Sequence, residues 1–111
     1  MTRYFKTTGI YADSNLLKVT VSYDAGNGYV ARITPCHKGN GCWGVTYSKE
    51  YYQYYNTLVC MLVPCGRRSA KKEAEACALA EEKINWLLEQ YVTMAKNNGG
   101  RHIEIVGELE D

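Results

Sequence analysis

The chain has 111 residues and a net charge of +1, and 46% of its residues are apolar. This size and composition predict one globular domain, residues 1–111, and exclude a disordered chain. No apolar run approaches the ~20 residues that a membrane span needs, and the N-terminus lacks the apolar segment of a secretory signal. We therefore expect a cytoplasmic protein without membrane contact, whose five cysteines stay reduced.

The small net charge hides an uneven distribution along the chain. Residues 1–72 carry ten Lys/Arg against three Asp/Glu, a net charge of +7, whereas residues 73–111 carry three against nine, a net charge of −6. This split favours a basic face and an acidic face, and hence electrostatic steering of a partner.

The N-terminal half predicts β-strands. Arg3–Ala12 is expected to be an edge strand. Leu16–Tyr23 alternates apolar and polar residues, as a half-buried strand does. After the glycine-rich turn DAGNG, Tyr29–Thr34 is expected to return as the second strand of a hairpin, which Pro35 ends.

Further strands are predicted on both sides of a helix. Cys42–Ser48 is expected to be a strand, and the apolar run Thr57–Val63 a central strand buried on both faces. His102–Val106 is expected to add a short last strand within residues 101–111, before a mobile acidic tail at Glu108–Asp111.

One long helix is predicted over residues 69–97. Ser69 is suited to cap its first turn, and Asn97–Gly100 to end it. A stripe of small and apolar residues recurs at helical spacing, namely Ala70, Ala74, Cys77, Ile84, Leu88, Tyr91 and Ala95. The predicted fold is α+β, with an antiparallel sheet of about four strands, at about residues 3–63, packed against this one long C-terminal helix.

Such a helix would be ~43 Å long. Leu79, Trp86 and Leu87 lie off its main stripe, so one sheet would leave them uncovered. A second copy of the chain is the simplest cover, and we therefore predict a homodimer with the Trp86 side of the helix at the interface.

The start of this helix carries a basic cluster in the sequence PCGRRSAKKEAEA. The basic cluster consists of Arg67, Arg68, Lys71 and Lys72. These cations would surround the positive end of the helix dipole, so they predict contacts with nucleic-acid phosphates. The alternative is the solvated start of a capped helix, with no ligand.

The same stretch resembles two families of nucleic-acid-binding domains. The succession of strand, glycine, serine, Lys-Lys and Ala/Glu-rich helix over Gly66–Leu88 is similar to the double-stranded-RNA-binding domain and to the AP2-like arm domain of tyrosine integrases. In the first family the lysines contact phosphates, a role that the resemblance gives to Lys71 and Lys72. In the second, the helix packs behind a sheet that reads DNA.

A cluster of tyrosines suggests a second contact surface. Five of the ten tyrosines lie close together, at Tyr47, Tyr51, Tyr52, Tyr54 and Tyr55. Tyrosine rings suit protein interfaces and can stack on bases. The alternative is that some of them pack under the sheet. We include these tyrosines and Trp86 as candidate partner-binding residues.

Chemistry at a metal or catalytic centre has little support in the sequence. Cys36, His37 and Cys42 share one predicted loop, but the cysteine spacing is wider than that of most zinc sites. No glycine-rich nucleotide loop and no nucleophile–base pattern is present. We expect no metal, no cofactor and no catalytic residue.

Together these features predict a small non-catalytic binding protein that engages nucleic acid, or a protein that handles nucleic acid, through a basic and tyrosine-rich face. A first alternative is an inhibitor or adaptor that acts by protein–protein contact, of the kind that phages and mobile elements use, such as anti-CRISPR proteins. A second alternative is a metal- or thiol-dependent enzyme.

Overall fold

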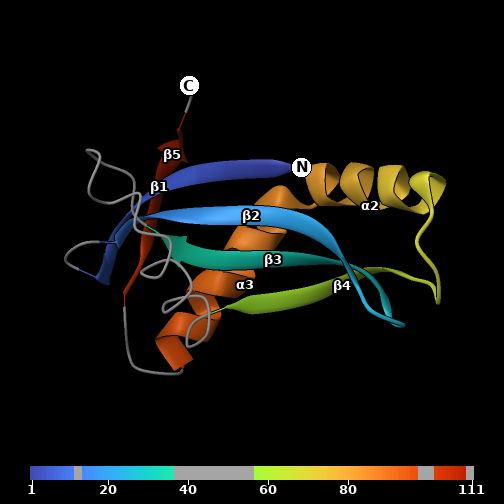
Figure 1. Cartoon of the computed structure of the whole chain (residues 1–111). Coiled ribbons are helices and arrows are strands. Elements are labelled where there is room, and N and C mark those ends of the chain that lie inside the picture. Colours follow the sequence, from blue (N-terminus) through green and yellow to red (C-terminus); the bar gives the residue numbers. More distant parts are fainter. Residues whose placement is uncertain (12–13, 37–56, 98–101, 110–111) are drawn as a thin grey trace, which may run out of the picture.

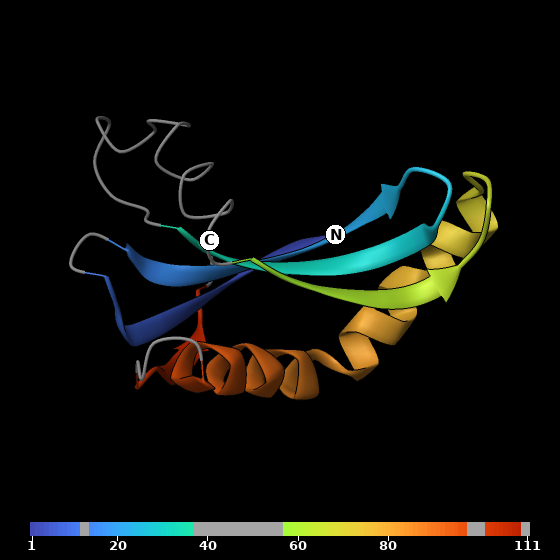
Figure 2. The same ribbon diagram turned by 90° about the horizontal axis from the view of Figure 1, so that it is seen from below.

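The structure is a computed structural model, and it describes residues 1–11, 14–36, 57–97 and 102–109. These residues form β1 (Thr2–Tyr11), β2 (Ser14–Asp24), β3 (Gly28–Cys36), β4 (Leu58–Pro64), α2 (Ala70–Glu82), α3 (Ile84–Asn97) and β5 (Glu104–Glu108). The strands make one antiparallel sheet in the order β4-β3-β2-β1-β5. Figures 1 and 2 show a curled sheet with both helices on one face. The predicted α+β class is confirmed.

The hairpin of β2 and β3 is the centre of the sheet, and its alternation of residues is as predicted. Leu17, Val19 and Val21 are buried on the face toward the helices. In the antiparallel register Val19 lies opposite Ile33, and Tyr23 lies opposite Tyr29. Each of these partners therefore points to the same face of the sheet, which is the face that forms the core.

The two helices complete the core with side chains of different size. Ala76 and Ala80 are the buried residues of α2, and small side chains allow a helix to approach a sheet closely. Helix α3 instead buries bulky residues, among them Leu87, Leu88 and Tyr91. The core therefore lies between one face of the sheet and these two helical faces (Figure 2).

The prediction of one long helix is wrong, because the helix breaks at Lys83. The amide of Lys83 still donates to the carbonyl of Leu79 at 2.9 Å, but its backbone angles, φ −98° and ψ 13°, end α2. A straight helix over residues 69–97 would be ~43 Å long, longer than the 39 Å greatest extent of the molecule. Because the sheet is curled, two shorter helices can each follow it where one straight helix would leave it.

The break also changes which residues face the sheet. Leu87, expected off the main stripe, is fully buried, whereas Ala70 and Ala74, expected on it, are exposed. Trp86 remains 48% exposed. The homodimer predicted from a single straight stripe therefore loses part of its premise and stays a prediction.

The sheet also differs from the prediction in the number and order of its strands. It has five strands rather than about four. The segment predicted as an edge strand is β1, which pairs with β2 on one side and β5 on the other. The run predicted as a central strand is β4, which lies at the edge and exposes Val59 and Met61.

One predicted boundary needs correction, and one prediction lies outside the described residues. Pro35 continues β3 opposite Leu17, at a point beyond Ile33, where the described pairing with β4 ends. A missing N–H is tolerated at such a place. The strand predicted at Cys42–Ser48 lies outside the described part of the chain.

The predicted mobile tail begins inside the sheet instead. Glu108 belongs to β5, and its carboxylate accepts hydrogen bonds from Arg3 of β1 at 2.8 Å (Nε) and 2.5 Å (Nη2). Arg3 also donates to Glu81 of α2 at 2.7 Å. The hydrogen bonds from Arg3 hold the pKa of Glu108 below its usual range. Arg3 thus ties three elements together.

Candidate nucleic-acid interface

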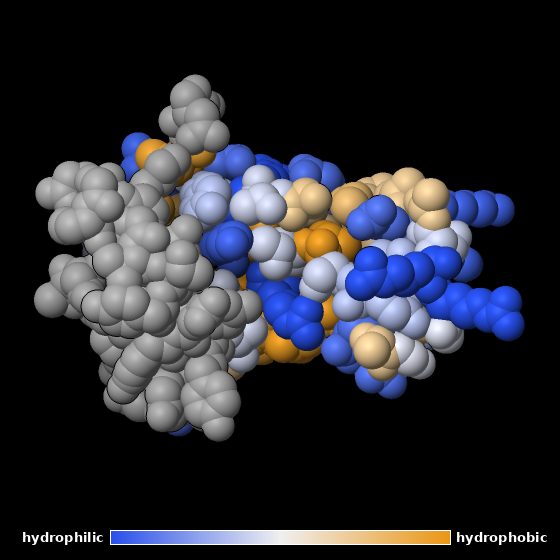
Figure 3. All heavy atoms as spheres, viewed as in Figure 1, coloured by the Kyte–Doolittle hydropathy of each residue, from blue (hydrophilic) through white to orange (hydrophobic). Residues whose placement is uncertain are grey.

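The basic cluster lies where β4 leads into α2. Ser69 caps the helix as predicted: its hydroxyl accepts a hydrogen bond from the Lys72 amide at 3.3 Å, and its carbonyl accepts one from the Glu73 amide at 2.9 Å. The free amides of the first turn and the positive end of the helix dipole therefore point out beside the cluster. In Figure 3, long hydrophilic side chains project from this end of the molecule.

Two tyrosines of the central hairpin hold this turn in place. The Tyr29 hydroxyl accepts a hydrogen bond from the Ser69 amide at 3.0 Å and donates one to the Ser69 carbonyl at 3.1 Å. The Tyr23 hydroxyl donates to the Gly66 carbonyl at 2.8 Å and accepts from the Gly26 amide at 3.1 Å. The two rings meet edge to face, with centroids 5.4 Å apart. The backbone that carries the cations is therefore fixed by the sheet.

The sequence alone did not single out these tyrosines. Tyr23 and Tyr29 flank the DAGNG turn and lie opposite one another on the buried face of the hairpin. Two tyrosines placed in register across a tight turn are the signal that marks them. Their partners, Gly66 and Ser69, lie about forty residues further along the chain, so the contacts themselves are not visible in the sequence.

The four cations of the basic cluster differ in the contacts that they make with other side chains. The Arg68 guanidinium lies 5.3 Å from the centre of the Tyr23 ring, a cation–π contact. Lys72 forms an ion pair with Glu75 at 3.5 Å. Arg67 and Lys71 are exposed and make no ion pair with any residue of the described ranges. These two side chains are therefore available to an anionic partner.

A shallow hollow beside the cluster does not suit a single enclosed anion. It is lined by polar groups of the hairpin and of the helix start, including Ser22, Tyr23, Arg68 and Glu73. The Glu73 carboxylate would repel a multivalent anion inside it. The cations therefore favour phosphates that are spread along a surface over one phosphate held in a pocket.

The remaining predicted site residues do not join this cluster. Trp86 lies in α3, and the Lys83 ammonium lies 5.7 Å from the centre of its ring. The five tyrosines Tyr47, Tyr51, Tyr52, Tyr54 and Tyr55 lie outside the described residues.

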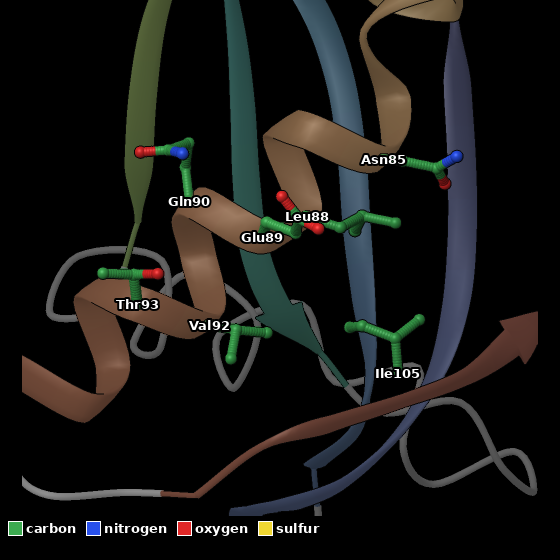
Figure 4. A pocket seen from close by; sticks show the side chains of 7 residues that line it. All are labelled: Asn85, Leu88, Glu89, Gln90, Val92, Thr93 and Ile105. Carbon is green, nitrogen blue, oxygen red and sulfur yellow. The ribbon is translucent and has the colours of Figure 1, made fainter.

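A second hollow lies between α3 and β5, and few of the side chains that line it could take part in catalysis. Figure 4 shows Leu88 and Val92 of α3 with Ile105 of β5 on its apolar side. Of the side chains that line it, Glu89 is ionisable, while Asn85, Gln90 and Thr93 are neutral. General acid–base catalysis needs a donor and an acceptor with tuned pKa values, and one carboxylate does not supply both.

Among the thiols of the described residues, that of Cys60 is poorly suited to catalysis. Cys60, Cys65 and Cys77 are free and partly buried. Burial raises the pKa of the Cys60 thiol, so the nucleophilic thiolate is disfavoured at neutral pH. Within the described ranges, no three His, Cys, Asp or Glu side chains gather to hold a metal ion, while His37 and Cys42 lie outside them.

Comparison with known proteins gives no relative. No protein-family model matches the chain, and neither a curated protein nor a solved structure does so. The resemblance of residues 66–88 to nucleic-acid-binding domains is therefore untested and stays a prediction. Among the described helices, none is long and apolar enough to span a bilayer.

The role of Tyr29 can be tested by removing one oxygen atom. We expect Tyr29→Phe to lower the free energy of unfolding by about 2 kcal/mol, because the Ser69 amide and carbonyl lose their hydroxyl partner in a partly buried place. The less buried Tyr23→Phe should cost about 1 kcal/mol. Urea denaturation followed by circular dichroism measures both, and an unchanged midpoint in Tyr29→Phe would show that the turn does not depend on this contact.

Proposed function

We propose that the chain is a non-catalytic binding protein that holds the phosphate backbone of a nucleic acid with the basic cluster. The observation that supports this function is the combination of four cations with an outward-pointing helix start on a turn that two tyrosines fix. Pre-placed cations lose little conformational freedom on binding, and each phosphate that they neutralise releases counterions.

The position of the cluster favours contacts with the backbone over contacts with base edges. Its residues are exposed or half-buried at one end of the molecule, and Glu73 follows directly after them. Lysine and arginine on such a surface supply attraction that does not depend on base sequence. The proposed activity is therefore binding of nucleic acid with weak sequence preference and strong dependence on salt.

Neutralising the basic cluster should remove binding without unfolding the protein. We expect the quadruple Gln variant of Arg67, Arg68, Lys71 and Lys72 to raise the Kd for a labelled duplex at least about tenfold. The slope of log K against log salt should become shallower by about 0.9 for each phosphate that the variant no longer neutralises. Exposed positions usually change stability by about 0.5 kcal/mol or less each. Fluorescence anisotropy over a salt series gives the affinities, and thermal unfolding gives the stability.

A matched control separates position from net charge. The second quadruple Gln variant removes the same amount of charge from four lysines elsewhere, Lys6, Lys18, Lys83 and Lys96. The Kd of this control should stay within about threefold of that of the unmodified protein. The lysines that it replaces attract the nucleic acid only at long range, where salt screens them. Equal losses in both variants would show that the cluster is not the site, and no binding of DNA or RNA at low salt would reject the function.

A protein-binding inhibitor or adaptor is the second candidate. The observation that favours it is the exposure of large apolar side chains, among them Trp86 at 48% and Val106 at 65%. Exposed aromatic and aliphatic groups are typical of contact surfaces between proteins. Affinity capture from a lysate with and without nuclease distinguishes the two candidates, because a partner held only through nucleic acid is lost after the digestion.

A further inference from the structure

The two edges of the sheet differ in how they are protected from pairing with another strand. An edge strand presents unpaired backbone N–H and C=O groups, and soluble proteins usually block it with charges, short length or irregularity. Strand β5 has these features: it has five residues, it carries Glu104 and Glu108, and its pairing with β1 shifts register between Lys6 and Thr7.

Strand β4 lacks most of the features that protect an edge strand from pairing. It has seven residues, and no charged residue occurs between Thr57 and Cys65. Val59 and Met61 are 50% and 49% exposed, while Leu58, Cys60 and Leu62 pack toward the core. Its register with β3 shifts between Tyr29 and Val30, near its far end.

The surface at this edge is apolar. In Figure 1, β4 forms one margin of the sheet, and Figure 3 shows hydrophobic surface at that margin. No described strand lies on its outer side. An uncharged edge of this length is an aggregation hazard unless a partner strand covers it.

The chemistry of this edge defines what would cover it. The partner must be an extended segment, so that its backbone groups can pair with those of β4. It must also be uncharged, because the edge offers no side chain to compensate a charge. Strand β4 of a second copy meets both conditions. We propose that two copies pair through β4, antiparallel about a two-fold axis at Cys60, into one continuous sheet. This pairing is independent of nucleic-acid binding.

This register places apolar side chains opposite apolar side chains on both faces of the sheet. With the axis at Cys60, Val59 lies opposite Met61 of the second copy, so the exposed side chains cover one another on the helix-free face. Leu58 then lies opposite Leu62, and Cys60 lies opposite its own copy. Cross-strand apolar pairs stabilise such a ladder, and no like charges meet. Because the strand is short, the interface is small, and we expect the weak association that is typical of small interfaces.

Charge at the exposed positions tests both the edge and its register. Sedimentation equilibrium of the unmodified protein over a concentration series up to 200 µM should give an average mass that rises with concentration toward twice the mass of the 12.5 kDa chain. The double variant Val59→Lys/Met61→Lys should be monomeric, since each new lysine would face another across the axis. Val106→Lys is the matched control, a valine on the other edge strand that is 65% exposed, and it should remain dimeric.

The register is tested by mixing opposite charges. The variant Val59→Glu/Met61→Glu should also be monomeric alone, but an equal mixture with the double Lys variant should restore the dimer, because Lys at 59 then faces Glu at 61. Circular dichroism verifies that each variant is folded. A monomeric unmodified protein, or a dimer that ignores charges on β4, overturns the proposal. A dimer that both variants disrupt but that their mixture does not restore overturns the register.

Discussion

Replacing Gly28 with alanine should lower the free energy of unfolding by at least about 3 kcal/mol, since backbone strain and overpacking each cost about 1–3 kcal/mol. Gly28 has a φ of +143°, which side-chain-bearing residues rarely adopt. A Cβ atom there would lie 2.3 Å from the Val63 carbonyl oxygen and 2.8 Å from the Cys65 amide nitrogen. Both contacts are with backbone, which cannot rotate away as a side chain would. Urea denaturation followed by circular dichroism measures the loss.

Gly26 is the control for this prediction, two residues away in the same turn. Its φ is also positive, at +77°, but nothing lies within 4 Å of a Cβ atom placed on it. Gly26→Ala should therefore cost only the left-handed backbone penalty, about 1 kcal/mol. Equal losses at the two glycines would show that the end of β4 does not pack against the hairpin as closely as the structure has it.

The close contact at Gly28 also explains part of the candidate interface. The Cys65 amide donates to the Asn27 carbonyl at 3.1 Å, so the hairpin turn holds the chain just before the basic cluster. The turn DAGNG was predicted from its glycines alone. Its second role, as a support for residues about forty positions later, depends on contacts that local sequence does not encode.

Features that arise from neighbouring residues were predictable. The alternation of Leu17, Val19 and Val21 identified a half-buried strand, and these residues are buried as expected. The hydroxyl of Ser69 identified the helix start, because an N-cap is a local hydrogen bond. The four cations of the basic cluster are likewise brought together by the helix start itself.

Features set by distant parts of the chain were not predictable in the same way. An apolar run such as β4 indicates a strand, but it does not say whether a neighbour lies on one side or on both. The place of β1 inside the sheet depends on β5, since Thr7 pairs with Ile105. No glycine or proline near Lys83 predicts the break in the helix. The break follows instead from the curl of the sheet.

Because the helix breaks at Lys83, neighbouring residues of α3 differ strongly in burial and in their contribution to stability. Leu87 is fully buried against the sheet, whereas Trp86 is 48% exposed. Truncating a buried leucine leaves a cavity that the surrounding side chains fill only in part, so Leu87→Ala should lower the free energy of unfolding by about 3 kcal/mol. Urea denaturation gives this loss directly.

Trp86→Ala serves as the matched control and should cost about 1 kcal/mol or less, because it removes mainly an exposed ring and its contact with Lys83. The sequence pattern alone placed Leu87 off the main stripe, on the same side as Trp86, and a straight helix would make the two losses similar. A greater loss at Leu87 supports a broken helix, in which α3 packs on the sheet with residues that do not continue the stripe of α2. A greater loss at Trp86 would mean that α3 is rotated from the orientation in the structure, and Trp86 would then belong to the core.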